Sequence, residues 1–345
     1  MKKCLVTKLN GSVDNETLLK VGEFVMHIST IDSPTKKTQS MSLKATNDLT
    51  LRIVGNGYFT DESLTENKGK SLVIPSAQTN TDVYFSNGDY DIVIDNKYYI
   101  TLLSYSFWSD LDTFKNRSFN VEDLAFSNSL KTLRLLYGLQ GDLSTLKTSS
   151  LIDLYVFNNQ NLYGDISKLS LRNIVMCAIN DTKLTGTTAG FQGNTVLTFI
   201  RTSGSGVTIR TSDIKKSTKL DSIIGTLSGT LDDLKNCGML SNIVVTPSNL
   251  TGDAATLPAN FTKLVINNVI KLTWSKRPSN YNRYGITGAI QFDNVDDVLK
   301  DMAACSVIKD VPAKVISLKG TRTSVSDDAV SKMQAEGWNI VVSPV

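Results

Sequence analysis

The sequence predicts an α/β solenoid preceded by an all-β N-terminal domain. Three observations lead to this class: short alternating segments between turn residues, a leucine pattern that recurs from about residue 130, and two helix patterns near the end. We expect a β-rich domain over 1–105, a repeat region over 106–290 and a cap of helices and strand over 291–345.

The N-terminal segment reads as short strands joined by tight turns. Residues 49–54 alternate with period two, so Leu49, Leu51 and Ile53 should share one buried face. Turn residues follow directly in 55–57, and another strong turn signal stands at 10–11. Strands of four to six residues at such spacing are typical of a small sandwich or barrel.

A leucine pattern recurs along the repeat region. Two or three apolar residues are followed by a polar stretch, then by Leu-x-Gly and a further apolar anchor. The anchors recur every 20 to 23 residues, at Leu139, Leu162, Leu184, Val207, Leu227 and Leu250. Leucine-rich repeats have periods of roughly 20–29 residues, so the pattern predicts an irregular leucine-rich repeat. Apolar pairs after the glycine, such as Leu143 and Leu146, favour a helical or 3₁₀ turn on the return side.

Two other folds remain open for the repeat region. A leucine-rich globular α/β domain could show this spacing by accident. A right-handed parallel β-helix also stacks coils of this length.

The C-terminal segment predicts two helices and a strand that cover the last repeat. Asn294 is placed to cap a helix over 295–304, and Ser326 a second helix over 327–336 that Gly337 ends. A final strand is expected over 338–342.

Composition excludes several functional classes. The 36 basic and 33 acidic residues leave a net charge of only +3, which gives no electrostatic case for binding nucleic acid. Four widely spaced cysteines predict neither a zinc site nor a disulfide framework, and we expect them to be reduced and buried.

Residues suited to catalysis are few. The only histidine, His27, lies in an apolar strand pattern, where a structural role is expected. The pairs Asp232-Asp233, Asp296-Asp297 and Asp327-Asp328 each fall at an expected helix start, where negative charge is favourable. We therefore predict that the protein is not an enzyme and that it uses no cofactor or metal.

The best candidate for a contact surface interrupts the repeat between residues 274 and 284. Aromatic and arginine side chains are favoured where proteins bind partners or sugars. The candidate residues are Trp274, Lys276, Arg277, Tyr281, Arg283 and Tyr284. The alternative is that these side chains only pack over the last repeats.

Export by a leader or a membrane span is not expected. The opening residues lack the apolar run of roughly 7–15 residues that a secretion signal needs, and no run reaches the roughly 18 residues of a membrane span. We expect a protein that is made and kept in a cytoplasm, or that leaves it by a route without an N-terminal signal, such as release by lysis.

Three N-terminal segments resemble a known family. Residues 1–11 (MKKCLVTKLNG), 18–23 (LLKVGE) and 55–59 (GNGYF) resemble the N-terminal domain of virion proteins from crAss-like tailed phages of gut Bacteroidales. The resemblance implies a capsid-attached head fibre or decoration of the virion, assembled in the host cytoplasm. Its N-terminal domain would bind other virion proteins, and its repeat region would project and could adhere to a host surface glycan or protein.

The same resemblance implies a homo-oligomer, since fibres are usually dimers or trimers. Two other functions remain open. One is a bacterial leucine-rich-repeat binding module for a protein or a glycan. The other is a polysaccharide-degrading enzyme on a β-helix, which would need two or three carboxylates facing one groove.

Overall fold

The computed structural model describes most of the chain. The described residues are 24–29, 39–45, 47–61, 66–76, 81–86, 89–95, 100–105, 117–124, 130–146, 149–306 and 314–345. Two of the segments that carry the family resemblance, 1–11 and 18–23, lie outside them, as do the turn predicted at 10–11 and Cys4.

The chain divides into two compact units, residues 1–151 and residues 152–345. The boundaries that the sequence predicts near residues 105 and 290 remain predictions. Each unit is described by itself.

The first unit opens with antiparallel strands. The elements are β1 (Phe24–Ser29), β2 (Gln39–Ala45), β3 (Leu49–Gly55), β4 (Phe59–Thr60), β5 (Ser71–Ile74), β6 (Thr81–Phe85), β7 (Asp89–Ile94), β8 (Ile100–Tyr105), β9 (Arg117–Asn120), η3 (Val121–Leu124), β10 (Thr132–Leu135), β11 (Leu139–Asp142) and η4 (Leu143–Thr145). Strand β7 pairs antiparallel with β1 and β3, and β2 pairs antiparallel with β6 and β8. The predicted shared face of Leu49, Leu51 and Ile53 is buried.

Parallel pairing begins within this unit. Strand β10 runs parallel to β8, with Leu133 beside Leu103, and β11 runs parallel to β9, with Leu139 beside Phe119. These leucines are buried, so the apolar positions of the leucine pattern lie in the core from its first copy onward.

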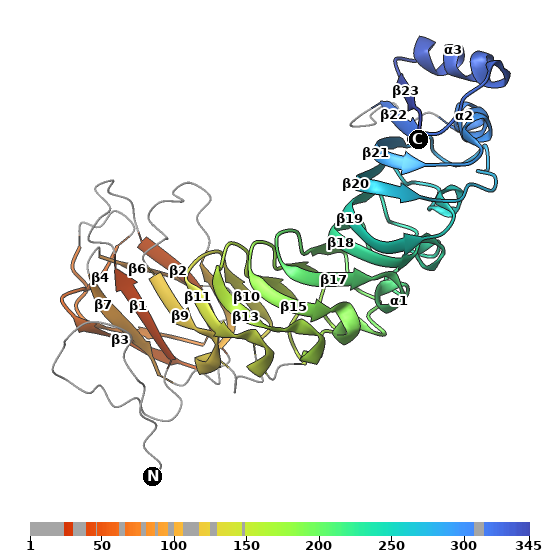
Figure 1. Ribbon diagram of the computed structural model, residues 1–345. Helices are drawn as coiled ribbons and strands as arrows, with labels where there is room; N and C mark the ends of the chain where they lie inside the picture. Colours follow the sequence, from red (N-terminus) through yellow and green to blue (C-terminus); the bar gives the residue numbers. More distant parts are fainter. Residues whose placement is uncertain are drawn as a thin grey trace. The chain divides into compact units, whose positions relative to one another are not determined.

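The second unit, taken by itself, consists of stacked parallel strands (Figure 1). Its first elements are β12 (Asp153–Tyr155), β13 (Asn161–Asp165), η5 (Ile166–Lys168), β14 (Met176–Ala178), β15 (Lys183–Thr187), η6 (Thr188–Phe191), β16 (Phe199–Arg201), β17 (Gly206–Arg210), α1 (Thr211–Ile214), β18 (Ser222–Thr230), η7 (Leu231–Leu234), β19 (Asn242–Thr251), η8 (Ala254–Thr256) and β20 (Lys263–Lys271). The later ones are β21 (Gly285–Gln291), α2 (Val295–Ala304), β22 (Val315–Lys319), η9 (Ser324–Ser326), α3 (Asp327–Ala335) and β23 (Asn339–Ser343).

The strands of this unit form two ladders that meet in β18. One runs through β12, β14, β16 and the start of β18, and the other through β13, β15, β17 and the end of β18. From β18 onward, single strands continue in order through β19, β20, β21, β22 and β23, all parallel. The leucine anchors Leu162, Leu184, Leu227 and Leu250 all point into the core between successive turns of the chain.

The glycine of the Leu-x-Gly pattern makes this stacking possible. Gly186 has φ +96°, and a Cβ there would lie 2.0 Å from the Asp165 carboxylate of the preceding turn. That carboxylate accepts a hydrogen bond from the Ser167 backbone N–H at 3.0 Å and so caps η5. The glycine therefore leaves space for the capping side chain of the turn stacked below it.

The predicted class, an α/β solenoid of leucine-rich repeats preceded by an all-β N-terminal domain, is wrong. The described residues are mostly β-strand, dominated by a large parallel sheet. Their α-helices are α1, of four residues, and the terminal α2 and α3.

The return segments explain the error. The pair Leu143 and Leu146 is buried, and η4, which begins at Leu143, is the 3₁₀ turn that the pattern allowed beside a helical one. The described returns η5 to η8 are also 3₁₀ turns of three or four residues, and α1 is a helix of only four, so these returns do not add enough helix for an α/β class. The prediction also placed a change from an all-β domain to an α/β region near residue 105. Parallel pairing already involves β8, which lies before that boundary, so the described strands show no such change there.

Both C-terminal helices form where the sequence predicts them, but neither has its predicted cap. Asn294 makes no side-chain cap bond, and its amide donates to the Trp274 carbonyl at 3.1 Å. Ser326 likewise does not cap α3, because its hydroxyl donates to Asp296 at 2.6 Å. Tertiary partners have replaced the local ones.

Candidate functional site

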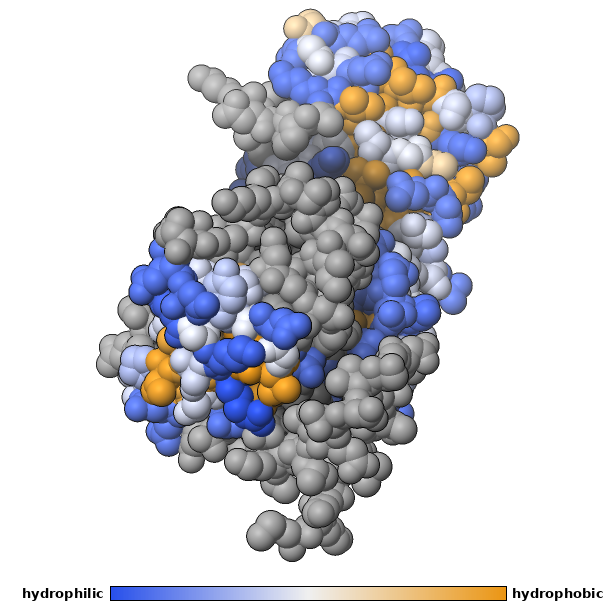
Figure 2. All heavy atoms as spheres, turned by 90° about the vertical axis from the view of Figure 1, so that its left-hand side faces the viewer, coloured by the Kyte–Doolittle hydropathy of each residue, from blue (hydrophilic) through white to orange (hydrophobic). Residues whose placement is uncertain are grey.

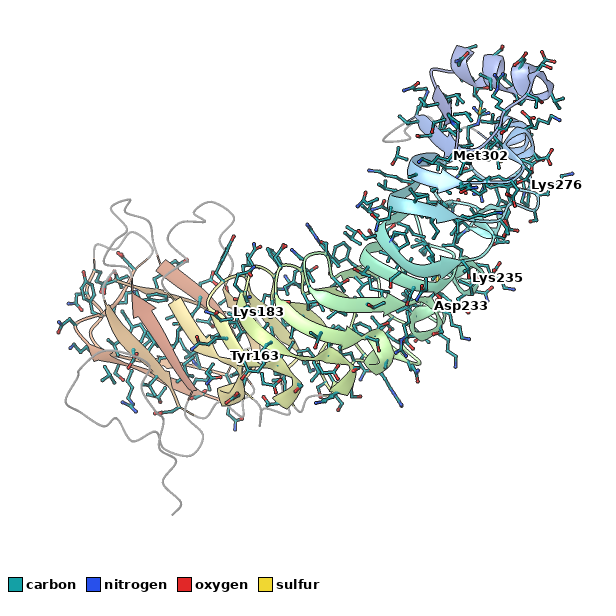
Figure 3. All side chains as sticks on the ribbon, viewed as in Figure 1. Tyr163, Lys183, Asp233, Lys235, Lys276 and Met302 are labelled. Atoms are coloured by element: carbon teal, nitrogen blue, oxygen red, sulfur yellow. The ribbon has the colours of Figure 1, made fainter. Side chains whose placement is uncertain are left out.

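The predicted contact residues lie between β20 and β21, and most of them are buried. Trp274, Arg277, Arg283 and Tyr284 are at most 5% exposed. Lys276 is exposed and Tyr281 half-buried. Figure 3 shows Lys276 at the rim of this segment.

Arg277 binds main-chain carbonyls of the preceding turn. Its Nη1 donates to the Ala255 and Leu257 carbonyls at 3.1 and 2.9 Å. Its Nη2 and Nε donate to Pro258 and Asn282 at 3.1 and 3.0 Å. The guanidinium also stacks over the Tyr284 ring, at 4.7 Å from its centroid. The buried carbonyls of Ala255 and Leu257 take their donors from this guanidinium, and the Pro258 carbonyl accepts from the Phe261 N–H as well, so Arg277 is a structural staple between the two turns.

Arg283 does the same for the end of α2. Its Nε and Nη2 donate to the Met302 and Ala303 carbonyls at 2.6 and 3.0 Å, and its Nη1 pairs with Glu336. The last carbonyls of a helix lack partners within the helix. Arg283 supplies these partners and joins α2 to the residue that follows α3.

Trp274 and Tyr284 are held in the same core. The Trp274 indole N–H donates to Asp301 at 3.0 Å, and the Tyr284 hydroxyl donates to the Ala254 carbonyl at 2.9 Å. Burial raises the pKa of Tyr284. For the four buried residues, these contacts agree with the alternative that the side chains only pack over the last repeats. Lys276 and Tyr281 remain at the surface, and a contact role for the segment stays a prediction.

The acidic pairs lie in helix starts, as predicted. Asp232 and Asp233 are in the first turn of η7, and the other two pairs open α2 and α3. Asp296 also accepts hydrogen bonds from Ser326 and Thr323, which hold the pKa of its carboxyl below the usual value. These contacts give Asp296 a structural role as well.

The described thiols are buried. Cys177, Cys237 and Cys305 are free, and desolvation raises the pKa of Cys177 to about 12 and that of Cys237 to about 11. Within the described ranges, no three metal-ligating side chains come together. His27 lies in β1, in register with Asp91 of β7 and Ser118 of β9. Among the described residues, no helix has the length and apolar character needed to cross a membrane.

A regular polar surface lies on the outer face of β15, β17, β18 and β19. Four threonines are aligned across these parallel strands: Thr187 with Thr208, Thr208 with Thr226, and Thr226 with Thr246. We call them the threonine row. Neighbouring strands lie about 4.8 Å apart, so the row presents a hydroxyl at each such step.

The threonine row faces away from the core. Thr208 stands between Val207 and Ile209, which are fully buried, so strand alternation directs its own side chain outward. Thr187, Thr208 and Thr226 are half-buried and Thr246 is exposed. Within the described residues none of the four hydroxyls makes a hydrogen bond, which leaves them available to a ligand.

An exposed aromatic residue lies on the same ladder. Tyr163 of β13 is 50% exposed and aligned with Lys183 of β15 (Figure 3). Strand alternation places Thr185 and Thr187 on the side of β15 that carries Lys183. The leucine pattern gives no sign of Tyr163, Lys183 or the threonine row. Comparing the outward positions of successive repeats, rather than the leucines, would have shown the threonines.

Comparisons with known proteins do not assign the chain to a family. No family model, no curated protein and no solved structure matches it.

Proposed function

We propose that the chain is a structural protein of a tailed-phage particle, which displays residues 152–345 as an adhesive surface for a host glycan. Residues 1–105 attach it to other virion proteins. The resemblance of segments 1–11, 18–23 and 55–59 to phage virion proteins supports the location on the particle.

The threonine row is the observation that supports glycan adhesion. Its hydroxyls are regularly spaced, point outward and make no hydrogen bond within the described part of the chain. A polysaccharide offers hydroxyls at regular intervals along an extended chain, and aromatic rings such as that of Tyr163 pack well against sugar rings. A parallel sheet that repeats one side chain on each strand suits a ligand that is itself a repeat.

Mass spectrometry of purified particles tests the location. We expect the protein in particles purified by density gradient, and immunogold labelling of intact particles should place it on the capsid. Its absence from particles that contain the other structural proteins of the phage would contradict the assignment.

Binding of purified host surface polysaccharide to the full chain tests the adhesive surface. Replacing Thr208 and Thr226 together by valine keeps shape and strand propensity but removes two hydroxyls. Each lost hydrogen bond costs about 1 kcal/mol, so the double variant should bind roughly tenfold or more weakly. Tyr163→Ala should weaken binding as well.

Two controls separate this surface from others. Thr321→Val removes an exposed hydroxyl outside the threonine row and should leave binding unchanged. Tyr281→Ala changes the segment between β20 and β21. If Tyr281→Ala abolished binding while the double valine variant bound normally, the adhesive surface would lie at that segment instead.

A further inference from the structure

Strand β23 is the last described strand of the parallel ladder, and no described strand pairs with its second edge, which we call the open edge. Among the described strands it pairs with β22, from Val315 beside Asn339 to Lys319 beside Ser343. The Asn339 N–H donates to the Lys314 carbonyl at 2.8 Å, and the Ser343 carbonyl accepts from the Gly320 N–H at 2.9 Å. Both bonds point toward the β22 side.

The other backbone groups of β23 therefore point away from β22. Successive residues of a strand direct their N–H and C=O groups to opposite sides. Since Asn339 and Ser343 face β22, Ile340 and Val342 direct their groups to the open edge. Such a row is a template for pairing with another strand.

Nothing in β23 protects this edge. Proteins usually guard an edge strand with a charge, a proline or a bulge. The sequence of β23 is Asn-Ile-Val-Val-Ser, and its register with β22 has no irregularity. Val341 is 45% exposed, and Ile340 and Val342 are half-buried. Figure 2 shows hydrophobic residues at the surface of the C-terminal elements.

The side chains of β23 are complementary to those of a second β23. An antiparallel pair centred on Val341 sets Asn339 against Ser343 of the other copy, polar against polar. It sets Ile340 against Val342, apolar against apolar. Like charges directly opposite each other would disfavour a symmetric pair, but no charged side chain of β23 meets its own copy.

The backbone supports the same register. In that pair, Ile340 and Val342 occupy the hydrogen-bonded positions, and these are the residues whose backbone groups point to the open edge. The two Val341 residues face each other at the non-hydrogen-bonded position, where side chains are closest. Because Ile340 and Val342 are aligned with Ile316 and Leu318, which are fully buried, the pair would continue the apolar face of β22 across the symmetry axis.

We propose that β23 is a dimerisation edge, and that it pairs antiparallel with β23 of a second copy of this chain around a two-fold axis at Val341. Such an interface is isologous, since each copy contributes the same strand. The proposal stands independently of the glycan surface.

The oligomeric state of the full chain tests the edge. Light scattering after size-exclusion chromatography should give a molar mass that rises with protein concentration and approaches the mass of a dimer. Val341→Lys places two like charges at the axis and should shift the chain to monomer. Val325→Lys adds the same charge at a valine outside β23 that is 63% exposed, and should leave the dimer intact.

Disulfide trapping gives a second readout that does not depend on weakening the protein. Residues facing each other at a non-hydrogen-bonded position have Cα atoms about 4.5 Å apart, which is within the range of a disulfide. In a Cys4→Ser chain, Val341→Cys should form a covalent dimer under mild oxidation, and Val325→Cys should not.

Three outcomes would overturn the proposal. One is a wild-type chain that stays monomeric at high concentration. Another is a dimer that Val341→Lys does not weaken. The last is a Val341→Cys chain that forms no more disulfide-linked dimer than Val325→Cys does. That result would also be found if the strand of another protein occupied the edge.

Discussion

At the scale of single residues, burial decides the role of the side chains that looked most suited to binding. Arginine and tryptophan attract attention in a sequence because they dominate binding surfaces. In this protein the polar ends of Arg277, Arg283 and Trp274 meet main-chain carbonyls and a carboxylate inside the unit. The hydrogen bonds that such side chains could make to a partner are made here within the unit, where they stabilise the fold.

Removing the Arg277 guanidinium should be strongly destabilising. Arg277→Met keeps an apolar stem but removes hydrogen bonds to four main-chain carbonyls. Those of Ala255 and Leu257 belong to buried residues, and each unsatisfied buried group costs about 1–3 kcal/mol. We expect the free energy of unfolding in urea to fall by about 3 kcal/mol or more. The neighbouring Lys276→Met changes an exposed side chain and should stay within about 0.5 kcal/mol of wild type. Equal stability of the two variants would show that Arg277 is not a staple.

At the scale of elements, the stacking of one turn of the chain on the next depends on glycines at fixed places. Gly186 combines a left-handed backbone with a close approach to Asp165, whereas Gly193 has φ +84° and open space around its Cα. Gly238 has open space and a φ that other residues adopt. A comparison of the three positions therefore distinguishes the cost of backbone strain from the cost of a steric clash.

Alanine at these glycines should give graded losses of stability. Gly238→Ala should be nearly neutral. Gly193→Ala should cost about 1–2 kcal/mol, the cost of a left-handed residue with a Cβ. Gly186→Ala should cost more, because the Cβ also displaces the capping carboxylate of η5. Thermal and urea unfolding would measure the order, and equal losses at Gly186 and Gly193 would rule out the clash.

Contacts between α2 and η9 predict a dependence of stability on pH. Hydrogen bonds from Ser326 and Thr323 lower the pKa of Asp296 in the folded chain. Its unfolded pKa lies near 3.9, so the stabilisation is present above that value and is lost as the pH falls through the folded pKa.

Asp296→Asn should therefore remove part of the acid dependence. Urea unfolding at pH 7 and at pH 3 should show a smaller drop in stability for Asp296→Asn than for wild type. Asp297→Asn, next to it on an exposed position, serves as the control and should keep the wild-type drop. An unchanged drop in the Asp296 variant would contradict the role of these hydrogen bonds.

At the scale of the whole molecule, local patterns predicted elements better than they predicted class. The alternation at Leu49, Leu51 and Ile53 and the helix patterns at α2 and α3 depend on neighbouring residues, and the structure contains them. The class depended on the return segments, whose leucines fit a helix and a 3₁₀ turn equally well. The described returns have only three or four residues, and apart from α1 they are 3₁₀ turns.

The candidate surfaces show the same division. Leucine spacing by itself determined which positions enter the core, because apolar side chains must leave water wherever the chain places them. Tertiary structure alone decided that Arg277 is buried and that the threonine row is aligned. It also decided that one edge of β23 has no partner among the described strands. Alignment and burial are properties of residues brought together from distant parts of the chain, and register between strands is what brings them together.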